Sequence, residues 1–148
     1  MSKKIAIYYG TMTGNSEGLA NSTFDKIKAE GGDVSLHNLV DVAPEELATN
    51  APNAIFVVST WGDGEPPADA EGFFEKLSTN NVDLSALKHA VFGLGDSNYE
   101  QFNKFAIALD ERLIALGSKP IKKVTTADVD FENTYPSWES EVRATFGA

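Results

Sequence analysis

The chain has 148 residues, of which 22 are acidic and 12 basic, and its formal net charge at pH 7 is −10. This length suits a single domain spanning residues 1–148, and the negative charge argues against a nucleic-acid partner, which would need a basic surface. The absence of cysteine excludes disulfides, thiolate metal sites and cysteine nucleophiles. No apolar run reaches the length of a membrane span and no signal region precedes the first strand, so we expect no membrane insertion and a cytoplasmic location.

Apolar periodicity divides the chain into alternating strands and helices. In chain order it predicts a strand at 4–10, a helix at 15–29, a strand at 33–38, a helix at 43–48, a strand at 54–60, a helix at 70–77, a strand at 90–94, a helix at 102–116, a strand at 119–125 and a helix at 135–146. This alternation predicts an α/β fold, a doubly wound parallel sheet with helices on both faces. Such sheets bind ligands at the carboxyl ends of their strands, so the loops there are the candidate site.

The first of these loops is rich in hydroxyl and amide groups. It reads Thr11-Met12-Thr13-Gly14-Asn15-Ser16 and joins the first strand to the first helix. Its side chains can bind phosphate oxygens, and the N–H groups at the helix start add the positive end of the helix dipole. It lacks the lysine of a P-loop and the glycine spacing of a dinucleotide fingerprint. Taken alone, it fits a phosphate site or an N-cap with a tight turn equally well.

Two further loops each carry a large aromatic residue beside glycines. The loop after the third strand reads Ser59-Thr60-Trp61-Gly62-Asp63-Gly64, and the loop after the fourth reads Leu94-Gly95-Asp96-Ser97-Asn98-Tyr99, followed by Phe102 and Asn103. Two aromatics on neighbouring loops could flank a planar ring. The alternative for Trp61 is that it caps the core above an acidic turn.

Charged residues are unevenly placed. No lysine or arginine occurs in residues 5–25, 33–75, 89–103 or 124–141, which include the candidate loops. Lysines gather instead near strand beginnings, at Lys3, Lys4, Lys88, Lys119, Lys122 and Lys123. We therefore expect a molecule that is acidic at its ligand-binding end. His37 and His89 lie on separate predicted strands, where a satisfied or exposed imidazole is expected in place of a metal or catalytic site.

On these motifs the chain resembles flavodoxins and the FMN domains of diflavin reductases such as cytochrome P450 reductase and sulfite reductase flavoprotein. The resemblance rests on the three loops above and on Asp128, which sits where those domains have an acidic residue after strand five. It implies a flavodoxin-like fold with strand order 2-1-3-4-5. A fifth strand that reads as uninterrupted favours the short-chain form, and the end at Ala148 favours a self-standing chain.

The resemblance also implies the cofactor and the roles of the site residues. The cofactor would be FMN, with its phosphate held by Thr11, Thr13, Asn15 and Ser16. Trp61 and Tyr99 would flank the isoalloxazine ring, Tyr99 being the better stacking partner, and the peptide at Gly62 would turn when the flavin is reduced. Asp96 and its neighbours would contact the pyrimidine edge or the ribityl chain.

The function expected from this resemblance is that of a flavodoxin, a low-potential one-electron carrier and not an enzyme. It would be a monomer whose acidic rim meets basic-faced redox proteins, namely a flavodoxin reductase and acceptor enzymes. The alternative is a small FMN-dependent NAD(P)H/quinone oxidoreductase. A receiver domain is disfavoured, because Tyr8-Tyr9, Ser59-Thr60 and Val124-Thr125 stand where it would need acidic residues, an aspartate and a lysine.

Overall fold

The fold comes from a computed structural model, which describes residues 4–10, 15–49, 52–59, 68–79, 81–94, 104–122, 124–127 and 131–146. Its strands are β1 (Ile5–Gly10), β2 (Val34–Asn38), β3 (Asn53–Ser59), β4 (Lys88–Leu94), β5 (Lys119–Pro120) and β6 (Thr125–Ala127). Its helices are α1 (Asn15–Ala29), the 3₁₀ turn η1 (Leu39–Asp41), α2 (Pro44–Thr49), α3 (Ala68–Thr79), α4 (Lys104–Ala115) and α5 (Phe131–Phe146). This order is the predicted one, although α5 begins four residues earlier than expected and η1 was not predicted.

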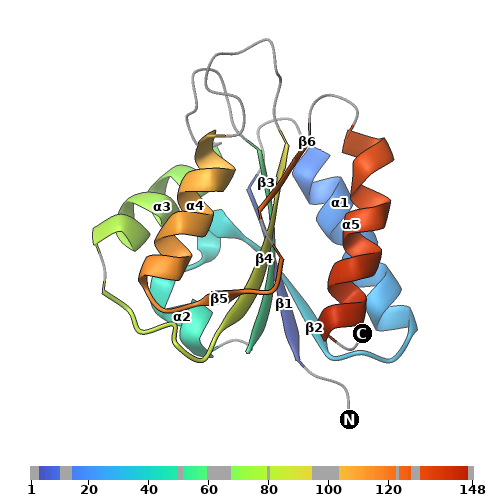
Figure 1. Cartoon of the computed structure of the whole chain (residues 1–148), viewed down its shortest axis with the longest axis horizontal. Helices are drawn as coiled ribbons and strands as arrows, with labels where there is room; N and C mark the ends of the chain where they lie inside the picture. Colours follow the sequence, from blue (N-terminus) through green and yellow to red (C-terminus); the bar gives the residue numbers. More distant parts are fainter. Residues whose placement is uncertain are drawn as a thin grey trace.

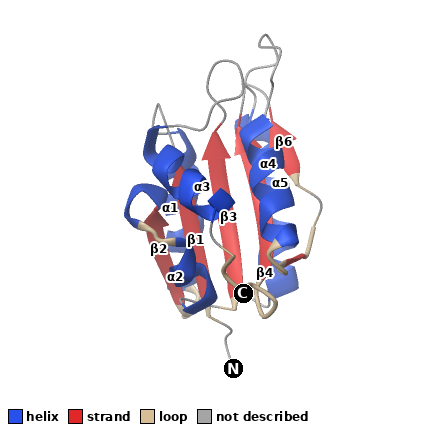
Figure 2. Cartoon of the chain, turned by 90° about the vertical axis from the view of Figure 1, so that its left-hand side faces the viewer, coloured by secondary structure: helices blue, strands red, loops and turns tan. Residues whose placement is uncertain are grey.

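All strands run parallel in one sheet of order β2-β1-β3-β4-β5, and β6 also pairs with β4. The strand arrows in Figure 2 accordingly point toward the same edge. The predicted parallel sheet and its strand order are thus confirmed. In this order β2 lies on one side of β1, and the chain then crosses over to place β3 on the other side. The topological switch point therefore lies between β1 and β3.

Helices cover both faces of the sheet, with α1 and α5 on one side and α3 and α4 on the other (Figure 1). Alternate β1 residues serve the two layers: Ile5 and Ile7 pack with α1 and α5, whereas Ala6 and Tyr8 pack with the opposite layer. The run from Ala54 to Val58 in β3 is buried throughout. A central parallel strand is covered on both faces, which explains why this run is continuously apolar.

Two helices end at glycines in the left-handed region. Gly31, with φ of 81°, follows α1, and the N–H of Gly32 donates to the carbonyl of Ile27 at 2.9 Å. Gly117, with φ of 106°, follows α4, and its N–H donates to the carbonyl of Ile114 at 2.9 Å. A side chain would be strained at such φ values. Within the part of the chain that the structure describes, no helix has both the length and the apolar character needed to cross a membrane.

The prediction of an uninterrupted fifth strand over 119–125 is wrong in detail. That position of the sheet is filled by two short segments, β5 and β6. Lys119 lies opposite Lys88, but Thr125 lies opposite Phe92, so the outer chain uses six steps where β4 uses four. The two surplus residues cannot stay in the ladder, and pairing stops after Ile121, whose N–H still donates to the carbonyl of His89 at 2.9 Å. Such an insertion in one strand is a bulge, which bends an edge strand.

Candidate functional site

The carboxyl ends of the central strands meet at one edge of the sheet. Gly10, the last residue of β1, lies opposite Val58, next to the end of β3. Ser59 lies opposite Leu94, and Leu94 lies opposite Ala127, so β3, β4 and β6 all end at the same level. The loops that the sequence singled out therefore leave the sheet side by side, at the switch point where parallel sheets bind ligands.

The first helix begins at this edge. Asn15 and Ser16, two of the predicted phosphate ligands, form the first two positions of α1, which runs for 15 residues. The first N–H groups of a helix have no partner within it and carry the positive end of its dipole, so they attract an anion. The structure thus places the start of α1 where the sequence predicts a phosphate.

The other predicted site residues are divided between strand ends and parts of the chain outside the described residues. Ser59 closes β3 and Leu94 closes β4. Leu94 is only 4% exposed and its side chain belongs to the core between the sheet and the α1/α5 layer, so any contact with a ligand would come from its backbone. The predicted ligands outside the described residues are Thr11, Met12, Thr13, Gly14, Thr60, Trp61, Gly62, Asp63, Gly64, Gly95, Asp96, Ser97, Asn98, Tyr99, Phe102, Asn103 and Asp128.

The opposite, amino edge of the sheet carries positive charge, as the sequence predicts. Lys88 and Lys119 open β4 and β5 and lie opposite one another, and exposed Lys4 directly precedes β1. A cavity of about 300 Å³ at this edge is bounded in part by Lys4, Leu84 and Leu87. It is far from the strand ends at which the candidate loops begin, so it is not part of the predicted site.

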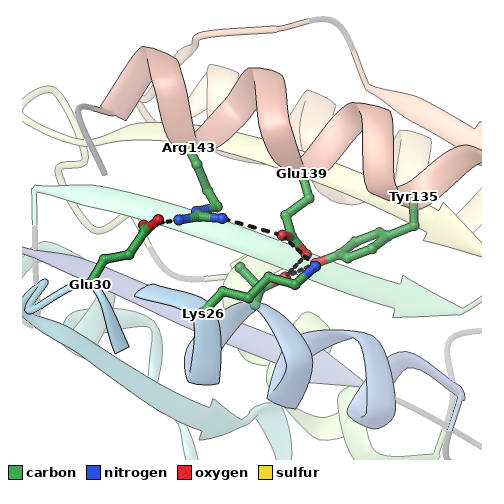
Figure 3. A network of polar contacts seen from close by, with 6 residues as sticks. Lys26, Glu30, Tyr135, Glu139 and Arg143 are labelled. Atoms are coloured by element: carbon green, nitrogen blue, oxygen red, sulfur yellow. Dashed lines mark hydrogen bonds and ion pairs between the residues drawn. The ribbon is translucent and has the colours of Figure 1, made fainter. Parts of the chain in front are cut away.

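Beneath the candidate site, polar side chains connect α1 to α5 (Figure 3). The hydroxyl of Thr23 donates to Glu139 Oε2 at 2.7 Å, and Tyr135 Oη lies 2.5 Å from Thr23 Oγ1. Since the one hydroxyl proton of Thr23 goes to Glu139, Tyr135 is the donor in the second bond. Burial raises the pKa of Tyr135 above its ordinary value, against the smaller opposing effect of the Thr23 hydrogen bond. The phenol therefore keeps the proton that this bond needs.

Cations complete the surroundings of Glu139. Lys26 Nζ lies 3.1 Å from Glu139 Oε1, and Arg143 Nη1 lies 3.7 Å from the same oxygen. Arg143 Nη2 also pairs with Glu30 at the far end of α1. Sequence reasoning missed this network. The signal was present in α5, where Tyr135, Glu139 and Arg143 recur every four residues and so form a polar stripe on a helix face that packs against the protein.

A second buried network brings together a serine, a histidine and an aspartate. His89 Nδ1 lies 2.6 Å from Ser118 Oγ, and His89 Nε2 lies 2.8 Å from Asp110 Oδ1. The arrangement resembles a hydrolytic triad, but His89 is 0% exposed and Ser118 3% exposed, so no substrate reaches them. Ser118 Oγ also donates to the carbonyl of Leu87 at 3.2 Å. The network ties β4 to α4 and to the start of β5, and the prediction of a satisfied histidine is confirmed at His89.

His37 is also satisfied, on β2, which lies at the other end of the strand order from β5. Its Nε2 lies 2.9 Å from Ser35 Oγ, and its ring stacks on Tyr8 at a centroid distance of 5.2 Å. Burial lowers the pKa of His37 below its ordinary value. Among the described residues, no group of three or more potential metal-binding side chains gathers in one place.

A parallel sheet of order 2-1-3-4-5, with the N-terminus of its first helix at the switch point, defines a doubly wound α/β protein of the kind that binds ligands at this edge. The sequence matches the family model for flavodoxin over residues 7–138, so the chain belongs to the flavodoxin family. The cofactor of this family is FMN, bound at the β1/β3 switch point. The residues present fit that cofactor, because α1 opens with Asn15 and Ser16 at the edge where its phosphate would lie.

Similar proteins include both reductases and flavodoxins. The chain is 35% identical over 139 residues to the sulfite reductase [NADPH] flavoprotein alpha-component of Bacillus subtilis, covering 93% of this chain and 23% of that protein. It is 33% identical over 146 residues to NADPH–cytochrome P450 reductase of Oryctolagus cuniculus, covering 94% and 21%. The chain thus spans less than a quarter of the length of these relatives. Flavodoxin 2 of Bacillus cereus has a similar structure, with a TM-score of 0.82, 31% identity, and coverage of 96% of this chain and 99% of that one.

Proposed function

We propose that this chain is a monomeric, cytoplasmic, low-potential electron carrier that receives one electron at a time from a reductase and passes it to acceptor redox enzymes. The bound FMN supplies the redox chemistry, and the protein binds it and sets its potential. The observation that carries the proposal is the meeting of three strand ends and the start of α1 at one edge, in a chain of the flavodoxin family.

In this proposal the phosphate is bound without a cation. Thr11, Thr13, Asn15 and Ser16 donate to its oxygens together with the first N–H groups of α1, which are favoured partners of anions. Trp61 and Tyr99 hold the ring from its two faces, and the backbone around Gly62 and Gly95 approaches its edge. Asp96 and neighbouring backbone groups contact the pyrimidine edge or the ribityl chain, and Asp128 is the acidic residue that follows strand five.

The charge distribution sets the direction of the redox tuning. No lysine or arginine occurs in residues 5–25, 33–75, 89–103 or 124–141, which include the candidate loops. Lys4, Lys88 and Lys119 stand at the opposite edge of the sheet. The candidate loops themselves supply no cation to the negative charge that the flavin gains on reduction, and this charge is less favourable beside acidic groups. The reduction potential for the second one-electron step, from half-reduced to fully reduced flavin, is therefore low. The same acidic edge would steer basic-faced partners to the ring.

A reductive titration tests this proposal. The purified protein is saturated with FMN, freed of excess flavin, and reduced stepwise with dithionite while its visible spectrum is recorded. A long-wavelength band that rises to half reduction and then disappears supports a one-electron carrier. Bleaching directly to the fully reduced flavin would favour the NAD(P)H/quinone oxidoreductase alternative, to be checked by whether NADPH alone bleaches the flavin. Failure to retain any flavin would refute the site assignment.

A second candidate is a role as the FMN module of a larger reductase. It is favoured by the 35% identity to a sulfite reductase flavoprotein component of which the chain spans 23%. The two candidates differ in how the electron arrives. A free carrier is reduced by a separate reductase in a reaction whose rate depends on the concentration of both proteins, and this dependence is measurable by stopped flow. A module receives its electron within one polypeptide, at a rate that dilution does not change.

A further inference from the structure

Glu139 has an unusual position for a carboxylate. It is 3% exposed, although it sits on a surface helix, and its two oxygens are contacted from both α1 and α5. A buried carboxylate is tolerated only with hydrogen bonds and counter-charges. Here the Thr23 hydroxyl and the Lys26 ammonium come from α1, and the Arg143 guanidinium comes from α5 itself.

These contacts fix α1 in a way that apolar packing cannot. The inner face of α1 is held by Ala20 and Ile27 against the isoleucines of β1 and β3. Apolar burial is strong but has no direction, so it allows a helix to slide or rotate on a sheet. The hydrogen bond from Thr23 to Glu139 fixes α1 in its second half. The ion pair of Glu30 with Arg143 fixes the chain directly after the last residue of α1 (Figure 3).

These contacts lie toward the C-terminal end of α1, but they also set the position of its N-terminus at the candidate site. Thr23 lies eight residues after Asn15, which is about 12 Å along a helix. A helix is stiff over that length, so a shift at Thr23 displaces its N-terminus by a similar amount. The attraction of a helix N-terminus for an anion falls off within the first turn, and it therefore depends on where that terminus is held.

We propose that Glu139 is a positioning residue for the cofactor phosphate: its buried carboxylate locks α1 to α5 and so holds the N-terminus of α1 against the phosphate of FMN. The inference rests on the proposed function, since it requires flavin at this edge. Glu139 makes no contact with the cofactor in this proposal. It acts on α1 directly through Thr23 and Lys26, and through Arg143, which pairs with Glu30.

The test compares FMN with riboflavin, which has the same ring and ribityl chain but no phosphate. Apoprotein is titrated with each flavin and binding is followed by quenching of flavin fluorescence. Glu139→Gln keeps the size of the side chain and removes its charge. The matched control is Glu141→Gln, the same change on the same helix at an exposed residue that pairs with Lys122 and not with α1. We expect Glu139→Gln to weaken FMN binding about 10-fold, a loss in the range of helix N-terminus interactions, while riboflavin binding changes less than twofold and Glu141→Gln changes neither.

A second pair of variants guards against a general loss of folding. Thr23→Ser keeps the hydroxyl that donates to Glu139, whereas Thr23→Val removes it at nearly constant volume. Thr23→Val should therefore show the same selective loss of FMN affinity as Glu139→Gln, and Thr23→Ser should keep the FMN affinity of the wild type. If Glu139→Gln and Thr23→Val lost FMN and riboflavin affinity equally, or lost neither, the positioning role would be overturned, although the wild type would still bind flavin. Wild-type protein that bound neither flavin would overturn the proposed function together with this inference.

Discussion

Replacing Ser118 with alanine should destabilise the protein strongly without affecting its function. The hydroxyl lies 2.6 Å from His89 Nδ1 and donates to the carbonyl of Leu87 at 3.2 Å, in a region where His89 is fully buried. Its removal leaves His89 Nδ1 without that partner, whereas the Leu87 carbonyl still accepts from the N–H of Lys119 at 3.0 Å. A buried polar group left unsatisfied costs about 1–3 kcal/mol. We expect the free energy of unfolding to fall by about 2 kcal/mol, and the melting temperature by roughly 6 °C for a chain of this size.

Urea denaturation followed by circular dichroism measures this loss. The matched control is Ser78→Ala, at an exposed position of α3, which should change stability by less than about 0.5 kcal/mol. Both variants should bind FMN as the wild type does, and a fluorophosphonate probe should not label Ser118 in the folded protein. A Ser118→Ala variant as stable as the control would show that the hydroxyl does not hold the network. Labelling of Ser118 would show that the serine, histidine and aspartate reach solvent and could act on a substrate.

Three further predictions concern backbone, pH and salt. Gly72→Ala, at an exposed helical site with no heavy atom within 4 Å of the added Cβ, should raise the free energy of unfolding by about 1 kcal/mol. Gly117→Ala should lower this free energy more than Gly31→Ala does, because the Cβ added at Gly117 also meets backbone, 3.1 Å from Ser85 N, whereas the one added at Gly31 meets nothing. Thermal denaturation of the three variants checks this order. Burial lowers the pKa of His37, so the unfolded chain binds a proton at this residue more readily than the folded chain does. The stability that neutral His37 contributes is therefore complete above pH 6.5 and is lost as the pH falls through the folded-state pKa. Urea titrations at several pH values should show that the free energy of unfolding falls less steeply with acid in His37→Gln than in the wild type. For the proposed carrier, raising ionic strength should slow reduction by a basic partner reductase in stopped-flow experiments, and a rate independent of salt would refute electrostatic steering.

The sequence predicts the fold well because the fold depends on local burial. The unbroken apolar run in β3 and the glycines that end α1 and α4 each record a local condition, a strand covered on both faces or a φ angle that a side chain resists. Fold and family also place the candidate loops at one edge of the sheet. The register of the fifth strand was not predictable in this way, because nothing in the periodicity of 119–125 reveals how many residues β4 supplies beside it.

The buried networks escaped prediction for a related reason. Thr23 and Glu139 are 116 residues apart, and His89 is 29 residues from Ser118. A polar residue on a helix reads from sequence as part of a solvated face, and only the packing of that helix decides whether the residue is buried with a partner. Such partnerships are set by tertiary contacts between distant segments, which hydrophobic periodicity does not encode.

Binding a phosphate without a cation suits the proposed carrier, because the electric field of a full charge reaches further than the field at a helix N-terminus. A lysine beside the phosphate would bind it firmly, but its full charge would also act on the flavin ring and favour the anionic, reduced form. The partial charge at the N-terminus of α1 decays within about one turn of the helix, so it can hold the phosphate with much less effect on the ring. This local field acts only if α1 is accurately placed. The contacts of Glu139 with Thr23 and Lys26 provide that placement, with the counter-charges kept on the α1/α5 side of the molecule and away from the strand ends. Cofactor retention and a low potential are then compatible in one small domain.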